Sequence, residues 1–420
     1  MEKVYLVAAY LKGEPYSNES VYELERLAHT AGAEVEEIFY APLAAYNPAT
    51  FIGKGKAYEI AEAVRENDIS AVIFNEEITP AQQKNLESII PAKIIDRTWL
   101  ILDIFAKRAR TKEGELQVEL AQLQFLLPRL SGKGAGLMQQ SGGRRGGIGT
   151  RGPGERKLEY DRRRLRIRIA KLEREIEQVK QERKVRRMRR AILPLPQVAI
   201  VGYTNAGKST LLNTLTKETA VYADDKLFAT LDPTTRRVSM PGGGSVLFTD
   251  TVGFIQKLPH NLVSAFRATL EELADADVIL HVKDASSKDI DAQNATVHKI
   301  VRDLEAQKIP MVEVFNKIDA VSQYTLKALK ARNHGAVFIS ALENKGVKEL
   351  LNAVEAALNA KWPQRKIKLK AEDLNLLGFI YDHSLVKTRR ESKDGITTLT
   401  VMITDGNYHS LQQKLKKHNK

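Results

Sequence analysis

Residues 197–210 read Gln197-Val-Ala-Ile-Val-Gly-Tyr-Thr-Asn-Ala-Gly-Lys-Ser-Thr210. An apolar, β-branched run leads into Gly202-x-x-x-x-Gly207-Lys208-Ser209, and the helical pattern of Leu211–Leu215 follows. A phosphate-binding loop needs this order of strand, glycine-rich loop and helix, because backbone N–H groups then point at phosphate oxygens beside a helix N-terminus. The lysine can bridge two phosphates, and the serine hydroxyl can bind Mg²⁺. The pattern therefore predicts an α/β fold with a nucleotide site.

Three further motifs follow in the order that a guanine-nucleotide enzyme needs. A strand-like run ends at Asp250-Thr-Val-Gly253, where the aspartate can hold Mg²⁺ through water and the glycine amide can contact a γ-phosphate. Another run ends at Asn316-Lys-x-Asp319, whose carboxylate can accept both N1–H and the 2-amino group of guanine. The turn Ser340-Ala-Leu342 offers the Ala341 amide to guanine O6. Adenine lacks the donor pair, so the set predicts specificity for guanine.

Three segments closely resemble the HflX family of ribosome-associated GTPases. They are Gly202-Tyr-Thr-Asn-Ala-Gly-Lys-Ser-Thr210, Phe228-Ala-Thr-Leu-Asp-Pro-Thr-Thr-Arg236, and Asp250-Thr-Val-Gly-Phe-Ile-Gln256 with Leu258-Pro-His260. The resemblance implies a GTP-hydrolysing translation factor that binds the large ribosomal subunit and its rRNA and splits stalled or idle ribosomes, notably under stress. It also implies that Thr230 is the switch threonine on Mg²⁺, with Thr234 and Thr235 as competing candidates.

The motifs and the resemblance together give the expected site for GTP or GDP. The expected nucleotide-binding residues are Gly202, Tyr203, Thr204, Asn205, Ala206, Gly207, Lys208, Ser209, Thr210, Phe228, Ala229, Thr230, Leu231, Asp232, Asp250, Thr251, Val252, Gly253, Asn316, Lys317, Asp319, Ser340, Ala341 and Leu342. The expected Mg²⁺ site consists of Ser209, Thr230 and, through water, Asp250. Lys208, Gly253 and Thr230 are the expected catalytic residues.

Phe254 stands where Ras-like enzymes carry the glutamine that orients the attacking water. An apolar side chain cannot orient water, so we expect slow intrinsic hydrolysis that ribosome binding stimulates by ordering the site. Gln256 is a disfavoured substitute because it lies two residues further on. Asn205 matches an asparagine that coordinates K⁺ in some related GTPases, and the alternative is a hydrogen bond that stabilises the loop.

Two heptad patterns before this domain predict an antiparallel helical hairpin. The positions that recur every seven residues are Leu102, Ala109, Leu116, Leu123 and Leu130 in the first arm, and Leu158, Leu165, Leu172 and Val179 in the second. Each arm would be about 45–50 Å long if continuous. Gly114 is the expected point of interruption in the first arm.

The positive charge of the chain is concentrated in this hairpin. Residues 129–190 hold 21 Lys/Arg against 7 Asp/Glu, an excess larger than the net charge of +13. The tip, Ser131–Gly154, holds ten of the 26 glycines and four basic residues. We interpret it as a loop that probes folded RNA with arginine. A disordered insertion and a solvated basic face are the alternatives.

Residues 3–97 alternate strand-like and helix-like segments, which predicts βαβ units around a parallel sheet. The predicted strands are Val4–Ala8, Val35–Phe39, Ala71–Phe74 and Lys93–Ile95, and the predicted helices are Val21–Ala31, Lys56–Glu66 and Ala81–Ile89. After Pro363, strands near Gly378–Tyr381 and Leu399–Ile403 predict a small α+β domain.

We therefore expect four domains. They are an N-terminal α/β domain (1–97), a basic helical hairpin (98–190) with its tip at 131–154, a P-loop GTPase domain (191–362) and a small C-terminal α+β domain (363–420).

The composition excludes several kinds of site. The chain has no cysteine, which excludes disulfides, cysteine-ligated zinc and thiol nucleophiles. The eight histidines show no ligand spacing; we expect His260 to be a structural cap and His281 a core histidine with its hydrogen bonds satisfied. No signal peptide is visible and no apolar run reaches the roughly 18 residues of a membrane span. We expect a cytoplasmic monomer.

Two other functions use the same basic surface and stay open at this point. One is a GTPase that acts in assembly of the large subunit. The other is an RNA-binding module whose affinity switches with the nucleotide and which does not split ribosomes.

Overall fold

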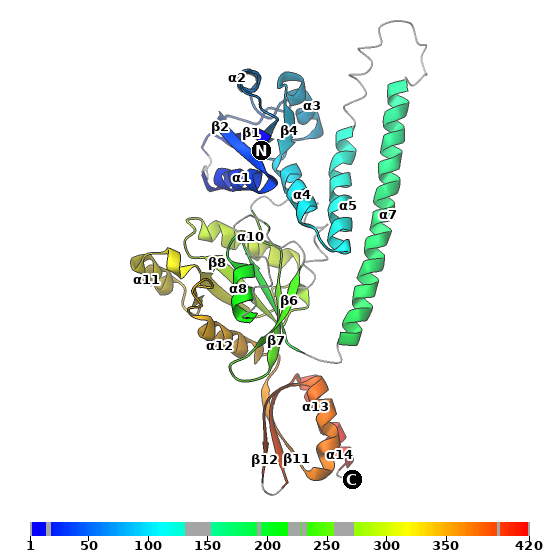
Figure 1. Cartoon of the computed structure of the whole chain (residues 1–420), viewed down its shortest axis with the longest axis vertical. Coiled ribbons are helices and arrows are strands. Elements are labelled where there is room, and N and C mark those ends of the chain that lie inside the picture. Colours follow the sequence, from blue (N-terminus) through cyan, green and yellow to red (C-terminus); the bar gives the residue numbers. More distant parts are fainter. Residues whose placement is uncertain are drawn as a thin grey trace. The chain divides into compact units, whose positions relative to one another are not determined.

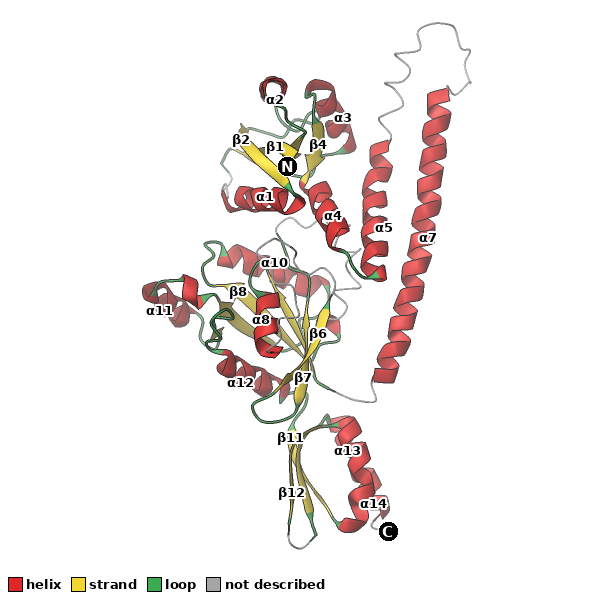
Figure 2. Ribbon diagram, in the orientation of Figure 1, coloured by secondary structure: helices red, strands yellow, loops and turns green. Residues whose placement is uncertain are grey.

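The structure is a computed structural model that describes residues 2–13, 18–130, 153–190, 195–216, 228, 233–255, 273–392 and 395–418. The described chain divides into two compact units, residues 2–179 and residues 180–418. Figures 1 and 2 show the elements of each unit. Residues 131–152, which make up nearly all of the expected hairpin tip, lie outside the described residues.

A parallel four-stranded sheet forms the core of the first unit, in the order β2-β1-β3-β4. Its strands are β1 (Glu2–Leu11), β2 (Ala33–Leu43), β3 (Ala71–Phe74) and β4 (Lys93–Asp96), and the connecting helices are α1 (Asn18–Ala31), α2 (Lys54–Glu66) and α3 (Pro80–Ile89). All four residues of β3 are buried, as in a parallel strand with both faces covered. The βαβ prediction is confirmed.

The first arm of the hairpin is interrupted, as expected, but the interruption does not fall at Gly114. It consists of α4 (Arg97–Arg108), which packs against α1, and α5 (Lys112–Arg129). The chain breaks between them because Thr111 is extended and its hydroxyl accepts a hydrogen bond from the Gly114 N–H, which caps a new helix. Gly114 therefore lies in the first turn of α5, and the interruption precedes it.

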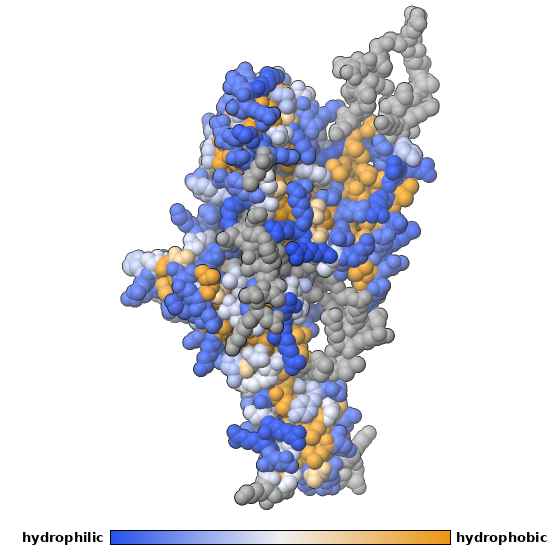
Figure 3. Space-filling view, viewed as in Figure 1, coloured by the Kyte–Doolittle hydropathy of each residue, from blue (hydrophilic) through white to orange (hydrophobic). Residues whose placement is uncertain are grey.

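The second arm, α7 (Pro153–Arg190), runs antiparallel to α5 (Figure 2). Leu116 of α5 packs with Leu172 and Ile176 of α7 in a small buried cluster, as the heptad pattern predicts. Arg168 donates two hydrogen bonds of 2.7 Å to the Glu119 carboxylate, which fixes the register of the two helices. Figure 3 shows apolar residues beside hydrophilic ones along this hairpin.

The second unit contains a six-stranded sheet in the order β10-β9-β8-β5-β7-β6, parallel except for β6. Its strands are β5 (Gln197–Gly202), β6 (Thr234–Ser239), β7 (Ser245–Asp250), β8 (Val278–Asp284), β9 (Met311–Asn316) and β10 (Val337–Phe338), and its helices are α8 (Lys208–Thr216), α10 (Ile290–Asp303), α11 (Gln323–Arg332) and α12 (Val347–Leu358). We call these elements the central domain. Leu280 and Val282 of β8 pack in one core cluster with residues of α8 and α12. Because side chains alternate along a strand, His281, which lies between them, faces the opposite side of the sheet.

The last part of the second unit is a three-stranded antiparallel sheet in the order β11-β13-β12, covered by helices. Its elements are β11 (Gln364–Leu369), α13 (Leu377–His383), β12 (Leu385–Glu391), β13 (Thr397–Met402) and α14 (Asp405–His418). The strand expected near Gly378–Tyr381 is wrong, because these residues belong to α13. Leu376 and Ile380 are both buried in the core of this part, and their spacing of four is that of a helix.

Candidate functional site

The glycine-rich loop connects β5 to α8 as predicted. Gly207 has a φ of +87°, and a Cβ at this position would collide with the side-chain amide of Asn316. Only glycine combines this left-handed backbone with such a close approach. Asn205, at φ +61°, also lies in the left-handed region, which asparagine tolerates better than most residues.

Lys208 is held inside this loop. Its Nζ donates a hydrogen bond to the Tyr203 carbonyl at 3.0 Å, so the loop closes around the ammonium group. Burial lowers the pKa of Lys208 to about 8, and the nearby Asp250 charge opposes this shift. An ammonium group with so little solvent is poised to gain from phosphate oxygens, because they replace the water that burial has removed.

Oxygen donors suited to Mg²⁺ meet beside the loop. The Ser209 hydroxyl donates a hydrogen bond of 2.6 Å to Asp250 Oδ2, and the aspartate is fully buried. The neighbouring Thr251 hydroxyl donates to the Ile200 carbonyl at 2.8 Å, which anchors the end of β7 to β5. A hydroxyl and a carboxylate in contact form a hard-oxygen donor set, so these residues fit Mg²⁺.

Asn316 joins the glycine-rich loop to the turn at Ala341. Its Nδ2 donates to the Ala206 carbonyl at 2.9 Å, and its Oδ1 accepts the Ala341 N–H at 2.9 Å. The Thr214 hydroxyl of α8 adds a hydrogen bond of 2.7 Å to the Ala341 carbonyl. The structure thus brings together two motifs that lie more than a hundred residues apart in the sequence.

The remaining residues of the guanine motif lie at the end of β9. Lys317 has a φ of +63° and pairs with Asp284 of β8 at 2.7 Å. Asp319 is exposed in the short 3₁₀ turn that follows, and is therefore accessible to a ligand. The Ser340 hydroxyl accepts the Glu343 N–H at 3.1 Å and shapes the Ala341 turn, whereas Leu342 is 79% exposed.

Gly253 and Phe254 lie close to the glycine-rich loop. The Thr204 N–H donates to the Phe254 carbonyl at 2.8 Å, and the Phe254 N–H donates to the Gly202 carbonyl at 3.1 Å. A Cβ on Gly253 would lie 2.9 Å from Thr204 Cα and 3.0 Å from Lys208 Nζ, so a side chain here would press on the lysine. The Phe254 ring is 2% exposed and offers no group to orient water.

Several expected residues lie outside the described part of the chain. These are Ala229, Thr230, Leu231, Asp232, Gln256 and His260. Phe228 is described, is buried and has a φ of +56°. Of the alternatives to Thr230, Thr235 lies on β6, and its hydroxyl is 2.9 Å from that of Thr249. Thr234 begins the same strand, opposite Asp250.

Sequence reasoning missed two features of the central domain. Asp284, the partner of Lys317, has no motif of its own, although its place at the end of β8 could have suggested a role. His281 is buried, as expected, but its Nδ1 has no hydrogen-bond partner among the described residues, so the expectation of a satisfied histidine is wrong. The strand register also places it beside Glu313 of β9, which no sequence spacing indicated.

Known families match the chain along most of its length. The matches are "GTP-binding GTPase N-terminal" (residues 18–106), "GTP-binding GTPase Middle Region" (108–190), "50S ribosome-binding GTPase" (197–317) and "HflX C-terminal domain" (324–420). Among the described residues, no helix has the length and apolar character needed to cross a membrane.

Individual proteins match as well. The GTPase HflX of Caldanaerobacter subterraneus subsp. tengcongensis is 50% identical over 357 residues, which cover 85% of this chain and 81% of that protein. The GTPase HflX of Escherichia coli is 42% identical over 385 residues, covering 91% and 89%. A crystal structure of a GTP-binding protein from the archaeon Sulfolobus solfataricus in complex with GDP has a TM-score of 0.44 and 23% identity, covering 86% of this chain and 99% of that one. The extent of the sequence identity, together with the guanine-nucleotide motifs on the strand ends of the central domain, shows that this chain is a GTPase of the HflX family.

Proposed function

We propose that the protein is a cytoplasmic, monomeric translation factor that binds the large ribosomal subunit and its rRNA through its basic hairpin, and that in its GTP-bound form it splits stalled or idle ribosomes, notably under stress. The observation that carries this proposal is the combination in one chain of a guanine-nucleotide site and the helix α7, with its dense positive charge. The family description for residues 197–317, "50S ribosome-binding GTPase", supports the choice of partner.

In the nucleotide site, the buried Lys208 binds the β- and γ-phosphates, and the Gly253 amide contacts the γ-phosphate. Ser209, Thr230 and, through water, Asp250 would hold Mg²⁺, which when bound neutralises phosphate charge. Asp319 accepts the N1–H and 2-amino donors of guanine. The Ala341 N–H, which donates to Asn316 Oδ1 in the structure, would exchange that bond for one to guanine O6. Because Asn316 ties the Ala341 turn to the glycine-rich loop, base recognition and phosphate recognition share one rigid support.

Hydrolysis by the isolated protein is slow, because the buried Phe254 replaces a group that could orient water. The ribosome completes the site by ordering the switch segments. Asn205 would hold K⁺, which when bound would offset developing charge on the phosphates in the manner of an arginine finger. Turnover compared in K⁺ and Na⁺ buffers tests this last point, since equal rates would eliminate it.

The hairpin binds the rRNA. Arg163, Arg164 and Arg166 follow one another along an exposed stretch of α7, where they can approach phosphates. Replacing an arginine that neutralises one phosphate lowers the slope of the salt dependence of binding by about one unit. The tip at 131–154, which holds four basic residues, is the part that we propose to enter the ribosomal RNA.

Sucrose-gradient analysis of 70S ribosomes tests the proposal. Wild-type protein with a non-hydrolysable GTP analogue should convert 70S particles into subunits, whereas a variant whose tip 131–154 is replaced by a short Gly-Ser linker should not. A second pair of variants tests the charge of the hairpin. Arg163→Gln/Arg166→Gln on α7 should weaken splitting. Its matched control, Lys327→Gln/Arg332→Gln on α11, removes the same number of positive charges and should not.

The outcome separates the two other functions. Binding to large subunits that leaves 70S particles intact would favour an RNA-binding module switched by nucleotide. Binding that is restricted to immature large subunits would favour a role in assembly. Either result would contradict the splitting activity proposed here.

A further inference from the structure

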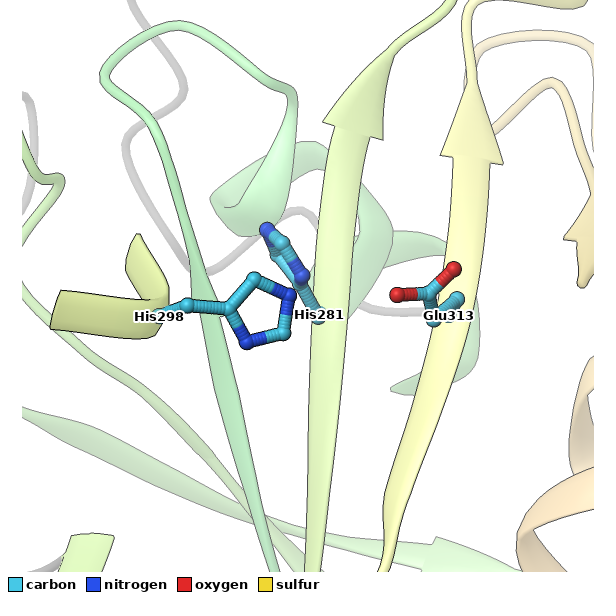
Figure 4. Close-up of side chains that lie close together, drawn as sticks. All are labelled: His281, His298 and Glu313. Carbon is cyan, nitrogen blue, oxygen red and sulfur yellow. The ribbon is translucent and has the colours of Figure 1, made fainter. Parts of the chain in front are cut away.

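Two histidines and a glutamate meet on the α10 side of the central sheet, away from the nucleotide loops' hydrogen-bond network. His281 of β8 and Glu313 of β9 are register partners on adjacent strands, and His298 comes from α10. One potential ligand atom from each of the three side chains lies within 4.8 Å of the other two. Figure 4 shows the His298 ring and the Glu313 carboxylate on either side of His281.

His281 is a buried histidine whose ring nitrogens need hydrogen-bond partners. The residue is 1% exposed, and its Nδ1 has no hydrogen-bond partner among the described residues. A buried polar atom without a partner destabilises the fold, and a ligand that binds this nitrogen would remove the penalty. A valine or isoleucine would fill the strand position without this penalty.

The His281 ring is in the neutral form, which can bind a metal ion. Burial lowers its pKa to about 3, and the charges of Lys283 and His298 act in the same direction. The ring is therefore neutral at physiological pH and retains a lone pair. Neutral imidazole and carboxylate are the usual ligands of zinc and of similar divalent transition metals.

Lys283 already pairs with Glu313 and therefore competes with a metal ion for this carboxylate. Its Nζ contacts Glu313 Oε2 at 3.1 Å, and a nearby ammonium charge disfavours a cation. The second carboxylate oxygen remains for a ligand bond. Zinc–ligand distances of about 2.0–2.2 Å require the three side chains to move closer together. His298 can make this movement, because it is exposed on the surface of α10.

We propose that His281, His298 and Glu313 bind a divalent transition-metal cation of the zinc class, with water completing a tetrahedral site. The cation links α10 to two adjacent strands of the sheet. Its role is to stabilise the central domain, and the site is distinct from the Mg²⁺ position at Ser209 and Asp250.

Zinc binding to the full-length chain tests this proposal. Protein saturated with Mg²⁺ and GDP, which occupies the nucleotide site, is titrated with ZnCl₂ against a chromophoric chelator. We expect one equivalent of Zn²⁺ to bind the wild type, and His298→Ala and Glu313→Gln each to bind at least about tenfold more weakly, since even loss of a group that only supports a ligand costs this much. His334→Ala removes an exposed histidine from the same domain and should bind Zn²⁺ as the wild type does.

Two further readouts distinguish the site from weak surface binding. Co²⁺ in place of Zn²⁺ should give the visible absorption of a tetrahedral site in the wild type and not in His298→Ala. Zn²⁺ should raise the unfolding temperature of the wild type and leave that of His298→Ala unchanged, because a ligand stabilises only a fold that binds it. Unchanged GDP binding shows that each variant is folded. Absence of Zn²⁺ binding by the wild type, or equal affinity in the wild type and both ligand variants, would overturn the proposal.

Discussion

The Asn316 side chain gives a direct test of how the two nucleotide-binding loops are held. In Asn316→Ala, the Ala206 carbonyl and the Ala341 N–H both lose their side-chain partner, at bonds that measure 2.9 Å each. Asn316, Ala206 and Ala341 are all at most 2% exposed, so water does not easily replace the lost amide. Each buried group left unpaired costs about 1–3 kcal/mol. We therefore expect the free energy of unfolding to fall by about 2–6 kcal/mol.

Nucleotide binding should weaken at the same time, because both loops lose the support that sets their position. If displacement of the loops weakens the binding free energy by about 1.4 kcal/mol, the size of one hydrogen bond, the dissociation constant for GDP rises tenfold. The assays are urea unfolding monitored by circular dichroism and titration with a fluorescent GDP analogue, at a temperature where the variant is folded.

Asn333→Ala is the matched control for this experiment. Asn333 also donates a side-chain hydrogen bond of 2.9 Å to a backbone carbonyl, that of Leu329 at the end of α11, but it does not connect two loops. Its removal should leave GDP affinity unchanged. If Asn316→Ala binds GDP within twofold of the wild type, the loops do not depend on this bridge and the reasoning is refuted.

Three further predictions concern charge and packing. Because burial holds the pKa of Lys208 at about 8 in the free protein, GDP affinity should be constant below pH 8 and weaken by about tenfold per pH unit above it, a dependence absent from Lys208→Ala. Burial raises the pKa of Asp96 to about 6, so the stability that its protonated carboxyl contributes is present below pH 4 and lost as the pH rises through 6. The free energy of unfolding of Asp96→Asn, measured by chemical unfolding, should lack this loss. An equal slope of unfolding free energy against pH in the wild type and the variant would contradict the prediction. Gly243→Ala should destabilise the chain by more than Gly335→Ala. The φ values of +87° and +88° impose equal strain of about 1–2 kcal/mol, but only the Cβ at position 243 would press on a backbone oxygen, that of Lys387 at 2.6 Å. Equal urea midpoints of the two variants would show that β12 does not pack against Gly243.

The parts of the site that the sequence predicted best are contiguous segments. The loop at residues 202–209 follows its own strand and leads into its own helix, so local spacing was enough to predict the order of strand, glycine-rich loop and helix around Lys208. The hydrogen bond of Lys208 to the Tyr203 carbonyl was not predicted. The pairing of Ser209 with Asp250 was predictable because parallel strands end at one edge of the sheet. The interior strand β3 likewise stood out as a short apolar run between helical patterns.

The features that sequence reasoning missed depend on packing between distant segments. His281 meets Glu313 only because β8 and β9 pair in one particular register, and a shift by one residue would turn Glu313 to the other face. The break between α4 and α5 was expected at Gly114 but lies before it, because the Thr111 cap starts a new helix against the heptad pattern that runs through it. At Gly378–Tyr381, four residues were too few to separate a strand from a buried helix, and packing of Ile380 against the sheet decided the outcome.

Sedimentation with isolated ribosomal subunits tests most directly whether the nucleotide state controls attachment to the ribosome. The full chain is pelleted with purified large subunits in the presence of a non-hydrolysable GTP analogue, of GDP, of an ATP analogue or of no nucleotide. We predict strong attachment with the GTP analogue, weaker attachment with GDP, and no effect of the ATP analogue. Equal attachment under all four conditions, or none under any, would contradict the central claim that a guanine-nucleotide switch governs binding of the basic hairpin to ribosomal RNA.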